Sequence, residues 1–126
     1  MIDMNRIAAL LLAALTLLPH KAVAETVLLM AEENGCYWCG RWNDEIAHIY
    51  PKTAEGKIAP LQRYDLYSET PENVALSSPV RFTPTFILVE DGQEIGRIEG
   101  YPGADFFWGL LGMVMEDAGI PLDTAG

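Results

Sequence analysis

The chain contains two cysteines, Cys36 and Cys39, which lie three positions apart between an apolar run and a helical pattern. Such a pair can exchange its disulfide with other thiols, or it can supply half of a zinc site. A closed tetrahedral zinc site needs about four protein ligands, and the histidines that could complete it are His20 and His48. We therefore favour redox use. A metal carrier and an inert structural disulfide stay open, although a bridge that closes so short a loop stabilises a fold little.

The elements around the cysteines assign them different environments. Residues 26–31 form a continuous apolar run, which is typical of a strand covered on both faces. After a short loop, one apolar helical face is predicted, ending at Pro51 and formed by Cys39, Trp42, Ile46 and Ile49. This spacing buries Cys39 and leaves Cys36 accessible, just before the first helical turn.

The remaining pattern predicts a second strand within residues 58–65 that begins near Pro60, at most two helical turns within 71–78, a β-hairpin formed by 85–89 and 94–99, and a last helix over 104–118. A helix that connects two strands implies a right-handed βαβ unit with parallel strands. The aromatic set of the last helix, Phe106, Phe107 and Trp108, is expected in the core, and any exposed face of it would be a docking patch.

The first 24 residues have the features of a signal peptide. Arg6 precedes an apolar run over residues 7–18, and the small residues Ala22 and Ala24 stand where a signal peptidase reads. We expect cleavage before Glu25, with an uncleaved anchor as the alternative, and export to the periplasm. The run is shorter than the 20 or so residues that span a bilayer, so no membrane span is expected after cleavage. Residues 25–126 then form one domain.

The charge of the chain limits its partners. The formal net charge is −10 for 126 residues. So acidic a balance argues against nucleic acid and anionic membranes as ligands. Half of the residues are hydrophobic, which is enough apolar surface for a folded domain.

The order of elements, with Cys36-Tyr37-Trp38-Cys39 early and Thr83-Pro84 before the hairpin, resembles the thioredoxin superfamily over residues 25–126. The resemblance implies an α/β fold: a four-stranded mixed sheet with a βαβ unit, then a β-hairpin and a C-terminal helix. It also implies a cis peptide bond before Pro84, which would face the cysteines.

Departures from the family pattern narrow the resemblance. Thioredoxin proper has an extra strand and helix before the C-x-x-C strand, a buried aspartate where this chain has Met30, and tryptophan where it has Gly35. The small size, export signal and aromatic C-x-x-C are similar to the periplasmic thioredoxins that accompany bacterial sulfur-oxidation (Sox) systems.

The expected chemistry is thiol-disulfide exchange, with the disulfide itself as the redox group and no cofactor. Cys36, at a helix start that favours the thiolate, is the expected nucleophile, and Cys39 is the resolving thiol. Glu33 or water is the expected base for Cys39. Pro84 would shape the site and the backbone of Thr83 would pair with an extended partner.

Between the cysteines, Tyr37 offers contact area, and Trp38 either does the same or packs under the loop. The expected partner carries a disulfide or persulfide, for instance a Sox sulfur carrier, and a membrane thiol reductase would supply electrons. Two alternatives remain: an oxidase that donates its disulfide, and a copper or zinc carrier that uses the C-x-x-C pair as soft ligands.

Overall fold

The computed structural model describes residues 25–122. The elements in chain order are β1 (Thr26–Glu32), α2 (Tyr37–Trp42), the π-helical turn η2 (Asn43–Ala47), the 3-10 turn η3 (Tyr50–Lys52), α3 (Ala54–Ile58), β2 (Leu61–Asp65), β3 (Thr85–Glu90), β4 (Gln93–Glu99) and α4 (Ala104–Asp117). The signal peptide expected over residues 1–24 lies outside the described residues. The four-stranded mixed sheet and the C-terminal helix confirm the predicted fold class.

The sheet has the strand order β2-β1-β3-β4, with β2 at one edge. β1 and β2 run parallel, as the βαβ prediction requires, whereas β3 is antiparallel to both β1 and β4. Two residues of positive φ, Asp91 and Gly92, connect β3 to β4, and this is the backbone that a tight hairpin turn needs. The end of β1 therefore lies beside the start of β3, where Ala31 pairs with Thr85.

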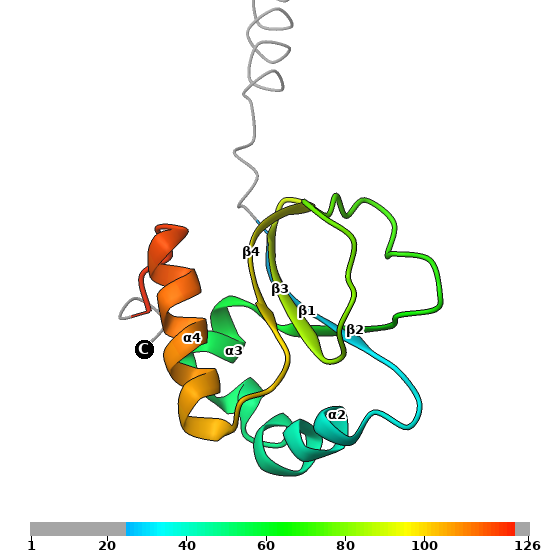
Figure 1. Cartoon of the computed structure of the whole chain (residues 1–126). Helices are drawn as coiled ribbons and strands as arrows, with labels where there is room; N and C mark the ends of the chain where they lie inside the picture. The colour runs from blue at the N-terminus through cyan, green and yellow to red at the C-terminus, as the bar shows by residue number, and fades with distance from the viewer. Residues whose placement is uncertain (1–24, 123–126) are drawn as a thin grey trace, which may run out of the picture.

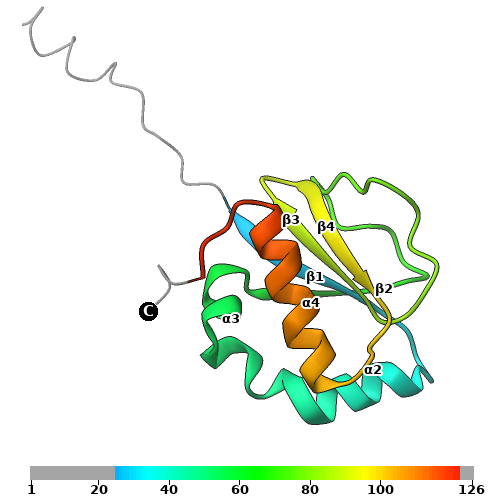
Figure 2. The same ribbon diagram turned by 60° about the vertical axis from the view of Figure 1, so that its left-hand side comes forward.

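The two faces of the sheet are covered differently. The helices α2, α3 and α4 lie on one face, and the long loop of residues 66–84 crosses the other (Figures 1 and 2). Because side chains alternate along a strand, Leu28 and Met30 of β1 join the large core under the helices, whereas Leu29 packs in a smaller cluster under the loop. Both faces of β1 are thus buried, as its continuous apolar sequence predicts.

The helix after the cysteines differs from the prediction in its second half. The α-helical turns end at Trp42 and continue as the π-turn η2. A π-turn holds more residues than an α-turn, so it changes which later residue faces the core. Trp42 and Ile46 are buried as expected, but Ile49 is 36% exposed and Tyr50 is buried in its place.

The second strand and the loop after it lie within the predicted bounds, but Ile58 does not belong to the strand. Ile58, expected in the second strand, ends the short helix α3, whose first turn is capped by the Thr53 hydroxyl accepting from the Gly56 N–H at 3.0 Å. β2 begins at Leu61, next to Pro60 as predicted. No helix forms within residues 71–78 of the described chain, where Ala75 instead makes a parallel bridge with Gln93 of β4.

A partly buried ion pair holds the 66–84 loop against β4. The side chains of Arg97 and Glu94 are 12% and 6% exposed and are joined by a 2.6 Å bond between Nη2 and Oε1. Arg97 Nη2 also donates to the Ser78 carbonyl at 2.8 Å, and Glu94 Oε1 accepts from the Ser77 N–H at 3.0 Å. The loop that leads to Thr83 is therefore fixed by charge-assisted bonds from the edge strand.

Candidate functional site

The two cysteines form a disulfide at the start of α2. Gly35 has a φ of 77°, which turns the chain into the helix at a backbone conformation that suits glycine. Cys36 is the N-cap residue with an extended backbone, and the Cys39 N–H donates to its Sγ at 3.1 Å. Cys36 is half-buried, whereas Cys39 is 4% exposed. The difference in exposure that the helical spacing predicts is present.

Thr83 and Pro84 lie at the same end of the sheet as the cysteines, because the start of β3 pairs with the end of β1. The Thr83–Pro84 peptide bond is cis and Pro84 is buried. The Pro84 carbonyl accepts from the Gly100 N–H at 2.7 Å, which ties the segment to the end of β4. Thr83 is half-buried and reaches the loop before Cys36 through its hydroxyl.

The contact partner of Thr83 is Glu33. Thr83 Oγ1 donates to Glu33 Oε1 at 2.6 Å, and the Tyr67 hydroxyl donates to the same carboxylate. The bond from Thr83, and to a lesser degree that from Tyr67, lowers the pKa of Glu33 below its usual value. A carboxylate held in its ionised form is a poor acceptor for a thiol proton, which argues against Glu33 as the base expected for Cys39.

The neighbouring Glu32 has a different environment. Its carboxylate forms an ion pair with Arg63 of β2 at 2.5 Å, and Arg63 also donates to Asn43 Oδ1 at 2.8 Å. The Arg63 guanidinium lies over the Trp42 ring, 5.6 Å from its centroid. Of the two acidic residues before Cys36, Glu32 is thus paired with a cation, whereas Glu33 is bonded to neutral hydroxyl groups.

The dipeptide between the cysteines projects into solvent. Tyr37 is 64% exposed and Trp38 is 52% exposed, and their rings meet edge to face with centroids 5.0 Å apart. Of the two sequence alternatives for Trp38, the structure therefore places it outside rather than under the loop. Phe82, just before Thr83, is 57% exposed. The disulfide and the Thr83–Pro84 segment are thus each flanked by exposed aromatic surface, the kind of surface that partner proteins bind.

A second chain of contacts joins the redox helix to the start of α4. Tyr101, which is buried, donates to Glu45 Oε1 at 2.9 Å. Glu45 Oε2 accepts from Arg41 at 3.1 Å, and Arg41 lies 3.5 Å from the Tyr37 hydroxyl. Burial and the bond to Glu45 raise the pKa of Tyr101 to about 12. Tyr101 and Glu45 are 56 residues apart in the sequence, so their contact cannot be predicted from local spacing.

The aromatic residues of α4 divide between core and surface. Phe107 is fully buried and Trp108 stacks on Tyr50 with an interplanar angle of 11°, as the core prediction expects. Phe106, however, is 70% exposed and Met113 is 60% exposed. Because α4 is apolar on nearly all sides, one face packs on the sheet and the other keeps apolar groups in solvent. The core prediction is therefore wrong for Phe106.

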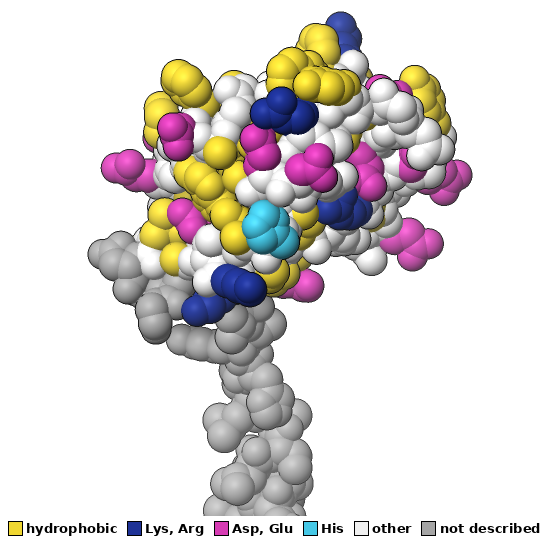
Figure 3. All heavy atoms as spheres, turned by 90° about the horizontal axis from the view of Figure 1, so that it is seen from below, with side chains coloured by type: hydrophobic (Ala, Val, Ile, Leu, Met, Phe, Trp, Pro, Cys, Tyr) yellow, Lys and Arg dark blue, Asp and Glu magenta, His cyan; other side chains and the backbone are white. Residues whose placement is uncertain are grey.

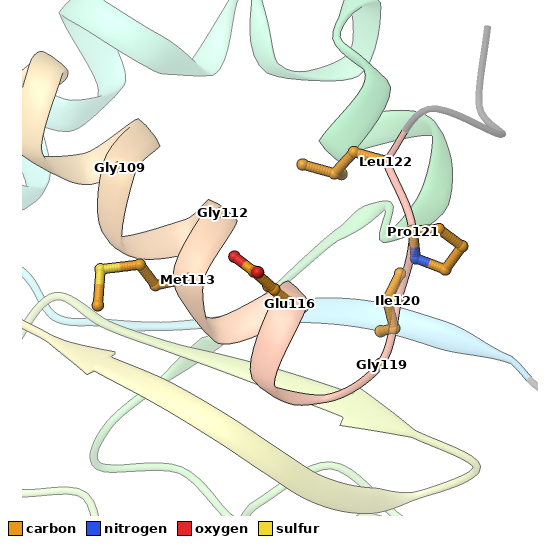
Figure 4. Close-up of a pocket in the computed structure, with 8 residues that line it drawn as sticks. All are labelled: Gly109, Gly112, Met113, Glu116, Gly119, Ile120, Pro121 and Leu122. Atoms are coloured by element: carbon orange, nitrogen blue, oxygen red, sulfur yellow. The ribbon is translucent and has the colours of Figure 1, made fainter.

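A shallow groove follows α4 between its glycines, Gly109 and Gly112, and the segment of residues 119–122 (Figure 4). It shares no lining residue with the hollow around Cys36. From below, apolar side chains are seen in several separate places among charged ones (Figure 3). His48, the one histidine between residues 25 and 122, is exposed.

The described residues, 25–122, contain neither a metal-binding cluster nor a membrane-spanning helix. No group of three or more histidine, cysteine, aspartate or glutamate side chains in this part of the chain could hold a metal ion. No helix in the same range has the length and apolarity to cross a membrane.

Comparison with known proteins agrees with this geometry. A family model described as a thioredoxin-like domain matches residues 20–114. The chain belongs to the thioredoxin-like family. The crystal structure of the reduced periplasmic thioredoxin SoxS from Paracoccus pantotrophus has 49% identity to this thioredoxin-like chain, with a TM-score of 0.73, and the match covers 75% of this chain and 99% of that one. A search of curated proteins gave no match.

Two more distant structures share the fold alone. They are thioredoxin-2 of a malaria parasite and a thioredoxin-fold protein from Helicobacter pylori, each 17% identical, with TM-scores of 0.52 and 0.53. The matches cover 75% and 73% of this chain, and 88% and 70% of the other chains. With its fold, its C-x-x-C disulfide and its likeness to SoxS, this thioredoxin-like protein is a thiol-disulfide oxidoreductase.

Proposed function

We propose that the protein is an exported reductase that keeps the cysteine of one or a few partner proteins reduced, with Cys36 as nucleophile and Cys39 as resolving thiol. The observation that carries this proposal is the asymmetry of the pair: Cys36 is only half-buried and accepts a hydrogen bond from the Cys39 N–H, whereas Cys39 is buried. A hydrogen bond to sulfur favours the ionised thiol, which is the attacking species in exchange.

The proposed cycle has two steps. In the first, the Cys36 thiolate attacks one sulfur of the partner's disulfide, the partner's S–S bond breaks, and its leaving thiolate takes up a proton. In the second, Cys39 loses its proton and attacks Cys36 Sγ, which releases the second partner thiol and forms the Cys36–Cys39 disulfide. Two electrons thus pass from the protein to its partner, and a membrane thiol reductase would restore the dithiol.

The surroundings of the pair supply the binding surface in this proposal. Thr83 would pair through its backbone with an extended partner segment, and Pro84 would form the wall of the site. Tyr37 and Trp38, both exposed beside the disulfide, would contact the partner. Aromatic side chains of this kind contribute large contact area at low entropic cost.

The proposed location and partner follow from the similarity to SoxS, which is described as periplasmic. We propose that residues 1–24 are a cleaved signal peptide, that residues 25–126 act in the periplasm, and that the partner is a Sox sulfur carrier with a disulfide or persulfide. No cofactor beyond the disulfide is needed for this cycle.

A trapping experiment tests the function and names the partner. In the Cys39→Ser variant, expressed with residues 1–24 in a sulfur-oxidising bacterium, the second step cannot occur, so we expect a covalent adduct on Cys36 that dithiothreitol releases. Mass spectrometry of the adduct should identify one dominant sulfur carrier. The matched control, Cys36→Ser with Cys39→Ser, should form none. Adducts with many unrelated proteins would contradict a dedicated partner, and no adduct at all would contradict the reductase.

A further inference from the structure

Glu33 and Thr83 join the two loops that frame the disulfide. Glu33 lies three residues before Cys36, and Thr83 comes directly before Pro84, 50 residues further along the chain. Their 2.6 Å hydrogen bond is part-buried, and Tyr67 donates a second bond to the same carboxylate. Three separate segments of the chain thus meet at one carboxylate beside the nucleophile.

The hydrogen bond from Thr83 to Glu33 joins the loop before Cys36 to the segment directly before Pro84. The nearest alternative, Glu32, is turned to Arg63 of β2 and not to this segment. On its other side the segment is anchored to β4 by Arg97, through the carbonyls of Ser78 and Pro79. The stretch of chain between Pro79 and Pro84 is therefore held at one end by Arg97 and at the other by Glu33.

From this geometry we infer that Glu33 is a positioning residue, which holds Thr83 in place so that its backbone can receive an extended partner segment. The inference rests on the proposed function of Cys36 and Thr83. In this role Glu33 does not touch the reacting sulfurs but acts through Thr83. Its ionised form, which the bonds from Thr83 and Tyr67 favour, is the stronger hydrogen-bond acceptor.

Positioning of this kind should affect large disulfides more than small ones. A protein disulfide needs the ordered Thr83 backbone, whereas a small neutral disulfide needs only access to Cys36. The loss of one hydrogen bond that orders a binding segment is expected to lower the ratio of the two reduction rates roughly three- to tenfold.

The test compares insulin with bis-hydroxyethyl disulfide as substrates, with dithiothreitol as electron donor. Glu33→Ala and Thr83→Val each remove the bond, so both should raise the KM for insulin and lower the insulin-to-small-disulfide rate ratio. The double variant should fall no further than either single variant, because both remove the same contact. Glu33→Gln and Thr83→Ser keep an acceptor and a donor and should restore most of the ratio. Glu32→Gln is the control and should keep the ratio.

Three results would overturn the inference. The first is an unchanged rate ratio in Glu33→Ala and Thr83→Val, and the second is a rate ratio in the double variant that falls by the product of the two single effects. The third is an equal fall in the reduction rates of both substrates. Thermal unfolding of each variant separates the last case from general destabilisation. A wild-type protein that reduces neither substrate would instead overturn the proposed function itself, so the two failures are distinguishable.

Discussion

Replacing Cys36 with serine is expected to abolish disulfide reduction, with a loss of about a thousandfold or more in the rate of insulin reduction. A serine hydroxyl is not ionised at neutral pH and cannot form the mixed disulfide, so the first step of the cycle is lost. The buried Cys39, 4% exposed, cannot take over the attack. Turbidity of reduced insulin measures the rate.

The Cys39→Ser variant provides the matched comparison. It should also lose turnover, but it should still react once, because Cys36 remains accessible. Intact-mass analysis after mixing with bis-hydroxyethyl disulfide should show one mercaptoethanol adduct on Cys39→Ser and none on Cys36→Ser. Adduct formation on the Cys36→Ser variant would show that the roles of the two thiols are reversed.

Replacing Arg97 with methionine should destabilise the fold by about 1–3 kcal/mol, because the partly buried carboxylate of Glu94 would lose its partner. Burial alone would raise the pKa of Glu94, but bonds from Arg97 and from the Ser77 N–H outweigh burial and lower it. The carboxylate therefore stabilises the fold at neutral pH, and this contribution is lost as the pH falls through its lowered pKa. Urea unfolding at pH 7 measures the difference.

Two controls isolate the pair. The side chains of the Arg41–Glu45 pair are 48% and 33% exposed, so Arg41→Met should change the free energy of unfolding much less than Arg97→Met does. Replacing Arg97 and Glu94 together by apolar residues should recover much of the stability, because no charge is left buried and unpaired. The cost of Arg97→Met should also shrink toward pH 4, where the unpaired Glu94 can take up a proton. A cost that stays constant with pH would mean that Arg97 acts through its carbonyl contacts alone.

The sequence was most informative where one local pattern decides the structure. The apolar run of β1, the hairpin around Asp91 and Gly92, and the helical spacing of Cys39 and Trp42 each depend on neighbours within one element. For this reason the parallel pairing of the two strands in the βαβ unit and the unequal exposure of the cysteines could be predicted. The resemblance then added the place of Pro84, which no local pattern could give.

The features that could not be predicted depend on tertiary contacts or small changes of helical pitch. The π-turn η2 has no sequence signature, yet it exposes Ile49 and buries Tyr50. The bond between Glu33 and Thr83 joins residues that are 50 positions apart. It depends on the pairing of β1 with β3, which brings the two loops together. No helix forms within residues 71–78 of the described chain, because apart from one turn, in which the Val74 N–H donates to the Pro71 carbonyl, the backbone there bonds to the β4 strand and its turn.

The reduction potential of the Cys36–Cys39 pair decides whether the protein is a reductase that acts through this disulfide. Equilibration of the purified protein with dithiothreitol buffers of known potential, followed by thiol alkylation and intact mass, gives the fraction reduced. A reductase predicts one two-electron transition near that of thioredoxin, about −270 mV. A transition near that of DsbA, about −120 mV, would contradict the reductase and make the protein a disulfide donor.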